Sequence, residues 1–140
     1  MILFDTSVLS RVFRRTRMGL SEKALAAEVQ DLLLGERPLG LPGFVLQEVL
    51  SGIRAEKQFA NLERRLLSAF TILPATARHH VEAARLRNKC LSVGLNVSGP
   101  DCLIAVLAIA GQHQLFALDE DFQAIAQHAP LDLYAPKVRP

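Results

Sequence analysis

The chain opens with Ile2-Leu3-Phe4-Asp5-Thr6-Ser7-Val8-Leu9, in which a run of three apolar residues stops at a carboxylate and two hydroxyls. A short apolar run bounded by polar residues predicts a strand buried on both faces, as in the middle of a parallel sheet. Asp5 then lies at the carboxyl end of that strand, where open α/β sheets bind their ligands. Asp, Thr and Ser are also good helix caps, so Asp5 alone leaves a structural and a functional interpretation open.

The composition predicts one domain of the α/β class. The 140 residues are enough for one continuous core. Half of them are hydrophobic but only 6% are aromatic, so the core must be built from Leu, Ala, Val and Ile, which favours helices packed on a sheet. We expect a single domain over residues 1–135, followed by a loose tail over residues 136–140.

Charge and cysteine content narrow the class of protein. The net charge of +2, from 16 basic and 14 acidic residues, neither demands nor excludes a polyanionic partner, so any nucleic-acid affinity must come from local clustering. Cys90 and Cys102 lack the spacing of metal ligands and are interpreted as reduced core thiols. No basic segment precedes the first apolar run, and no stretch approaches the roughly eighteen apolar residues of a membrane span. We therefore expect a soluble, cytoplasmic protein without a membrane partner.

Short strands alternate with helices along the chain. The predicted strands cover residues 2–4, 39–41, 71–73, 115–118 and, at an edge, 131–134. The predicted helices cover residues 8–15, 22–34, 44–53, 56–69, 77–93, 100–110 and 122–127. We expect Ser21 to cap the helix over 22–34, and Val81, Ala84 and Leu91 to face inward from the helix over 77–93. The alternation predicts a parallel sheet wrapped by helices, with right-handed crossovers that bring all strand ends to one rim.

Three further carboxylates are predicted near the rim at which Asp5 lies. Asp119 follows the fourth strand, Asp101 falls in the first turn of a helix that is apolar all round, and Glu48 stands at the margin of an apolar helical stripe. Each has an ordinary alternative: Asp119 or Asp121 caps a helix, Asp101 satisfies a helix dipole, and Glu48 faces solvent.

Acids gathered in one crevice need neutralisation. Two unit charges about 4 Å apart repel each other by roughly 4 kcal/mol at an effective dielectric near 20. Carboxylate oxygens select hard cations such as Mg²⁺ or Mn²⁺, and the absence of Cys or His at metal spacing argues against zinc. Ions held by carboxylates are used in phosphodiester hydrolysis, so the residues predict metal-dependent phosphate chemistry.

Four arginines follow the first strand closely. Arg11, Arg14 and Arg15 share one face of the helix over 8–15, and Arg17 extends the cluster. Guanidinium groups bind phosphates or an acidic protein segment through paired hydrogen bonds, although a merely solvated face is the alternative.

Four motifs together resemble the signature of PIN-domain nucleases, and most closely that of the small VapC-type toxins of bacterial toxin–antitoxin pairs. The motifs are Asp5-Thr6-Ser7, Glu48 in the third helix, Asp101-Cys102-Leu103-Ile104-Ala105, and Asp119-Glu120-Asp121-Phe122. The resemblance covers nearly the whole chain and implies a three-layer α/β/α PIN-like fold. It also implies that Asp5, Glu48, Asp101 and Asp119 are the catalytic, metal-binding acids for Mg²⁺ or Mn²⁺, with Asp121 as an auxiliary and Thr6 or Ser7 as a hydroxyl beside the metal.

The resemblance further implies an endoribonuclease, often a homodimer, that is neutralised by a small antitoxin whose carboxy-terminal segment occupies the site. Arg11, Arg14, Arg15 and Arg17 would then bind RNA or that partner. With few aromatic residues for base stacking, selectivity would rest on shape and phosphate contacts.

One residue departs from the family pattern. Ala117 stands where such proteins commonly have Thr or Ser, so one polar contact is missing or is supplied by Ser7. A non-catalytic PIN-like binding module and a housekeeping RNA-processing nuclease remain alternative functions. A phosphatase or receiver domain fits less well, because the phosphatase pattern has a second Asp where this chain has Ser7 and no matching catalytic Lys context is evident.

Overall fold

The structure is a computed structural model that describes residues 1–13 and 19–137. The strands are β1 (Ile2–Phe4), β2 (Leu39–Pro42), β3 (Thr71–Leu73), β4 (Gln114–Phe116) and β5 (Asp132–Leu133). The helices are α1 (Thr6–Phe13), α2 (Leu20–Leu34), α3 (Gly43–Leu50), α4 (Glu56–Ala69), α5 (Ala77–Ser92), α6 (Gly99–Ala110) and α7 (Glu120–Ala126). Arg14, Arg15 and Arg17 lie outside the described residues.

The five strands form one parallel sheet in the order β3-β2-β1-β4-β5. β1 is central and its three side chains are completely buried, as the opening apolar run predicts. The chain moves outward from β1 to β3 and then returns past β1 to β4 and β5, so right-handed crossovers place the later helices on the opposite face. The predicted three-layer α/β/α fold is confirmed.

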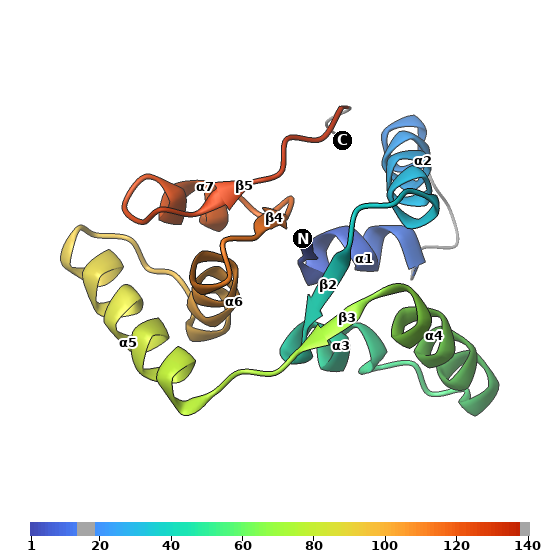
Figure 1. Ribbon diagram of the computed structural model, residues 1–140, viewed down its shortest axis with the longest axis horizontal. Helices are drawn as coiled ribbons and strands as arrows, with labels where there is room; N and C mark the ends of the chain where they lie inside the picture. The colour runs from blue at the N-terminus through green and yellow to red at the C-terminus, as the bar shows by residue number, and fades with distance from the viewer. Residues whose placement is uncertain (14–18, 138–140) are drawn as a thin grey trace.

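Two groups of helices cover the sheet. Contacts join α1 to α2 and α3, and α3 to α4, whereas α6 packs on α5 and α7. Figure 1 shows α5 and α6 to the left of β2 and β3, and α4 to their right. β5 pairs with β4 and stands at the end of the strand order, as the predicted edge strand.

A row of aromatic rings crosses the core. Phe4 of β1 lies 5.1 Å from Phe70 and 5.3 Å from Phe116 of β4, measured between ring centroids. Phe116 in turn lies 4.7 Å from Tyr134, which follows β5. Edge-to-face and tilted pairs at these distances are favourable, so the row ties the segment after β5 to the middle of the sheet.

The predicted inward face of α5 is wrong. Val81 and Leu91 are 46% and 42% exposed, and Ala84 is exposed as well. The buried side chains of α5 are Ala83, Leu86 and Cys90. These three positions, spaced by three and four, form one helical stripe next to the predicted one. α5 packs on α6, a helix apolar enough to be buried, and that packing selects which weakly apolar stripe of α5 is covered.

The predicted cap of α2 is also wrong. The helix begins at Leu20, and its N-cap residue is Gly19, which has no side chain that could accept a capping hydrogen bond. Ser21 therefore lies inside the first turn, where its hydroxyl donates to the Glu22 carboxylate at 3.3 Å. Cys90 and Cys102 are free and buried, as expected of core thiols, and burial foremost raises the pKa of Cys102 to about 11. No helix among residues 1–13 and 19–137 is long and apolar enough to cross a membrane.

Candidate metal centre

Three carboxylates meet beyond the carboxyl end of β4. Asp101, Asp119 and Asp121 each offer an oxygen atom, and these atoms lie within 4.8 Å of one another. Asp119 is the N-cap of α7 and accepts a hydrogen bond from the backbone N–H of Asp121 at 2.9 Å. Ser98 caps α6 by accepting the backbone N–H of Asp101 at 3.1 Å. The starts of two helices thus bring these acids together.

Burial and the negative charge of the cluster shift the pKa of Asp101. Its pKa is raised to about 6, first by burial and then by the negative charges of Asp5 and Asp119, with a smaller effect of Asp121. The hydrogen bond with Ser98 opposes this rise. The cluster therefore holds more negative charge than it can easily carry. A divalent cation would relieve that charge, and an all-oxygen donor set fits the hard cations Mg²⁺ and Mn²⁺.

Asp5 lies at the end of β1 and is only 5% exposed. Its Oδ2 accepts hydrogen bonds from the Ser7 hydroxyl at 2.7 Å and from the Ser7 backbone N–H at 3.2 Å. The same hydroxyl accepts the backbone N–H of Leu118 at 3.0 Å. Ser7 therefore makes the polar contact between the ends of β1 and β4, next to the position that Ala117 leaves apolar.

Glu48 reaches the same region from α3. This half-buried carboxylate accepts a hydrogen bond of 2.8 Å from the hydroxyl of Thr6, the neighbour of Asp5 in the chain. Among the described residues, neither Asp5 nor Glu48 belongs to a group of three ligand side chains as tight as that of the three aspartates. Asp121, which the sequence suggests only as an auxiliary, therefore lies in the tightest group, whereas Glu48 lies outside it.

The sequence analysis does not name the second buried acid, Glu28, which joins Asp5 in this class. This residue of α2 is 6% exposed and accepts hydrogen bonds from the Tyr134 hydroxyl at 2.7 Å and from the backbone N–H of Lys137 at 2.9 Å. Burial and Glu28 together raise the pKa of Tyr134 to about 12. The sequence does indicate that Glu28 is buried, because Glu28 lies between Leu25 and Val29 on the inner stripe of α2.

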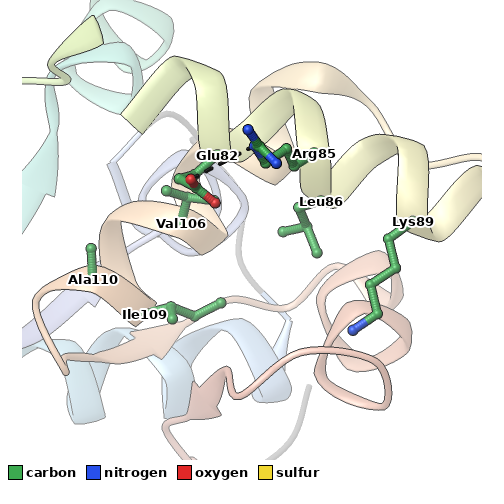
Figure 2. A pocket seen from close by; sticks show the side chains of 7 residues that line it. All are labelled: Glu82, Arg85, Leu86, Lys89, Val106, Ile109 and Ala110. Atoms are coloured by element: carbon green, nitrogen blue, oxygen red, sulfur yellow. Dashed lines mark ion pairs between the residues drawn. The ribbon is translucent and has the colours of Figure 1, made fainter. Parts of the chain in front are cut away.

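A hollow that none of the candidate acids lines is not a candidate site. It lies between α5 and α6, has a volume of about 300 Å³, and has Leu86, Val106 and Ile109 among its apolar lining residues (Figure 2). Its charged groups are already partnered. Glu82 pairs with Arg85 at 3.9 Å, and Lys89 donates to the His128 carbonyl at 2.6 Å.

The fold and the acids define the chain as a parallel-sheet α/β protein with a carboxylate centre at the ends of its strands. The model of the PIN domain matches residues 2–127, and the chain belongs to the PIN-domain family, a family of nucleases. The predicted family membership is confirmed.

Solved structures share the fold. FitAcB from Neisseria gonorrhoeae is 22% identical, with a TM-score of 0.75 over 97% of this chain and 98% of that one. A toxin–antitoxin complex from Klebsiella pneumoniae is 22% identical, with a TM-score of 0.70 over 99% of each chain. VapBC2 from Rickettsia felis, bound to a DNA fragment from its promoter, is 20% identical, with a TM-score of 0.72 over 96% of this chain and 98% of that one. The curated protein sequences that were compared contain no significant match.

Proposed function

We propose that this chain is a metal-dependent endoribonuclease and the toxin of a toxin–antitoxin pair, which hydrolyses RNA phosphodiester bonds at its carboxylate centre. The observation that carries the proposal is the convergence of Asp101, Asp119 and Asp121, with Asp5 near enough to raise the pKa of Asp101. Membership of a nuclease family supports the reaction type, and the like folds of the toxin–antitoxin structures support the biological role.

In this proposal Asp5, Asp101 and Asp119 hold Mg²⁺ or Mn²⁺, with Asp121 and Glu48 as further acidic ligands. A divalent ion held by carboxylates supplies an activated water and stabilises the leaving oxygen. The chain itself orients the acids. Ser7 fixes the Asp5 carboxylate through two hydrogen bonds, and Thr6 fixes Glu48 through one. Such partners of metal ligands typically change affinity or activity about 10–100-fold when they are lost.

The proposal includes the partners of the enzyme. RNA would meet Arg11 beside the acids, and an antitoxin would cover the centre. The Klebsiella pneumoniae structure, a toxin–antitoxin complex of the same fold, supports a protein partner of this kind. The proposed enzyme is a homodimer and acts in the cytoplasm, where cellular RNA is found.

The proposed reaction can be tested with purified protein and a labelled RNA pool. Cleavage should require Mg²⁺ or Mn²⁺, stop in EDTA, and fall by more than about 100-fold in Asp101→Asn, which removes a metal ligand and not merely its partner. Asp31→Asn is the matched control, since Asp31 is an exposed acid of α2. Circular dichroism checks that both variants fold. Undiminished cleavage by Asp101→Asn would show that the carboxylate centre does not carry out the reaction.

The toxin role is tested in a bacterial host. Expression of the wild-type chain alone should arrest growth, and expression of Asp5→Asn should not. Arrest by both proteins would favour the binding-module alternative, because toxicity would then not require an intact acid centre. Metal-dependent cleavage in vitro without any arrest would favour a housekeeping nuclease.

A further inference from the structure

A hollow of about 390 Å³ adjoins the acid cluster. It shares Asp119 with that cluster, and we call it the Tyr134 hollow. Its walls come from α1, the segment before α7, α7 itself and the segment after β5, and they include Arg11, Asp119, Gln123, Leu133, Tyr134 and Ala135. A molecule bound at the acids can therefore reach into this hollow along the protein surface.

The hollow contains an available cation. Within the described part of the chain, Arg11 makes no hydrogen bond and no ion pair, although it lines the same hollow as Asp119 and Glu120. A guanidinium group binds phosphate oxygens through paired hydrogen bonds, so Arg11 can hold a phosphate next to the acids. The hollow between α5 and α6 differs, because its charged groups already have partners.

The part of the lining that comes from β5 and the segment after it is mainly apolar, and Tyr134 in it is held in place. The Tyr134 ring packs on Phe116, and its hydroxyl donates to the buried Glu28 carboxylate. Glu28 also accepts the backbone N–H of Lys137, so the segment that carries the wall is tied to α2. A preorganised aromatic wall binds a flat ligand with little cost of ordering.

We infer that the Tyr134 hollow is a nucleotide subsite, which binds the nucleotide next to the scissile phosphate. The base packs against Tyr134 and Leu133, the Gln123 amide faces the base edge, and Arg11 holds the phosphate. This inference rests on the proposed ribonuclease function and adds the place where the substrate is recognised. The volume lies at the low end of the roughly 300–1,000 Å³ typical of ligand sites, which suits one nucleotide better than a protein helix.

Steady-state kinetics on a short RNA provides the first test. Ala135→Trp fills the hollow from an exposed position, and Arg11→Gln removes its free cation. Each variant should raise KM by about tenfold, through a lost base contact in Ala135→Trp and a lost phosphate contact in Arg11→Gln, and leave kcat within about twofold. Ala27→Trp is the matched control, because Ala27 is exposed on α2 and should leave both constants unchanged.

A direct binding measurement separates this inference from the proposed function. Adenosine 5′-monophosphate and uridine 5′-monophosphate are titrated into the protein in EDTA, and backbone amide shifts are followed by NMR. We expect saturable shifts over residues 117–123 and 133–135, with an affinity at least about tenfold weaker in Ala135→Trp. Absent shifts there, or equal affinity in Ala135→Trp, would overturn the subsite.

The outcomes of the two tests remain distinct. A wild-type protein that cleaves no RNA with Mg²⁺ or Mn²⁺ refutes the proposed function, whereas the titration still reports on the hollow. Cleavage with an unchanged KM in both hollow variants refutes the subsite and leaves the nuclease intact. An unchanged KM combined with loss of antitoxin binding in Ala135→Trp would assign the hollow to the protein partner and overturn the inference.

Discussion

The hydroxyl of Ser7 donates a 2.7 Å hydrogen bond to the Asp5 carboxylate while it accepts the backbone N–H of Leu118. One small side chain thus joins the ends of β1 and β4, the two strands that are followed by Asp5 and Asp119. The orientation of the buried Asp5 carboxylate is therefore set by the sheet.

Ser7→Ala should weaken both the metal centre and the fold. Asp5 loses a hydrogen bond to its charged form, and the Leu118 N–H loses its acceptor, so the free energy of unfolding should fall by about 1–3 kcal/mol. Affinity for Mn²⁺, measured by titration calorimetry, should fall by about 10–100-fold. Ser68→Ala, an exposed serine of α4, is the control. Unchanged affinity would mean that Ser7 does not orient a metal ligand.

Asp101→Asn should leave the metal-free protein at least as stable as the wild type. The substitution removes a charge that burial and the neighbouring Asp5 and Asp119 disfavour. At pH 7.5 the free energy of unfolding in urea should be unchanged or higher by up to about 1 kcal/mol, since solvent screens a half-buried group. A loss of several kcal/mol would give Asp101 a structural role.

The metal-free protein should become less stable as the pH rises from about 4 to about 6. In this range Asp101 keeps its proton in the folded state, where its pKa is about 6, but is ionised in the unfolded chain. The folded state therefore binds more protons, and stability falls as the pH rises until Asp101 is ionised in both states. Thermal melting in EDTA should show this step in the wild type and a smaller one in Asp101→Asn. In the same range Mn²⁺ affinity should rise with pH, because protons compete with the metal.

Tyr134→Phe should destabilise the protein by about 1–3 kcal/mol, because the buried Glu28 carboxylate loses a donor. The wild-type phenol should titrate near pH 12 by ultraviolet absorbance. Since the unfolded phenol ionises near pH 10, stability should fall as the pH rises from about 10 to 12, and Tyr134→Phe should lack that fall. A phenol that titrates near pH 10 in the folded protein would contradict the buried contact.

The packing of α5 is tested by two leucines on the same helix. Leu86→Ala should cost about 2–4 kcal/mol, since Leu86 is 8% exposed and its loss leaves a cavity. Leu91→Ala should cost less than about 1 kcal/mol, because Leu91 is 42% exposed. Urea unfolding of both variants gives the comparison, and equal costs would show that the Leu91 stripe is also covered.

The sequence alone was sufficient to predict the central strand, its position before Asp5, and the alternation of strands and helices. These features follow from local rules, because a short apolar run between polar residues has few stable places other than the middle of a covered sheet. The helix over 56–69 and the strand over 71–73 also have the predicted bounds. Local patterns failed where two stripes of a helix were equally apolar, and the packing of α6 then decided which stripe of α5 is buried.

For the candidate acids, too, the sequence names the residues and the tertiary structure decides their contacts. Strand ends were enough to name Asp5 and Asp119, since parallel strands deliver their carboxyl ends to one rim, whereas Asp101 was named from its place in the first turn of an apolar helix. The meeting of two helix starts decides which carboxylates come within 4.8 Å of one another. It brings Asp121 into the group, whereas Glu48 accepts a hydrogen bond from Thr6 and lies outside it. The contact between Glu28 and Tyr134 joins residues 106 apart in the chain. No local pattern predicts such a pair, because it forms only after the sheet has placed the end of the chain beside α2.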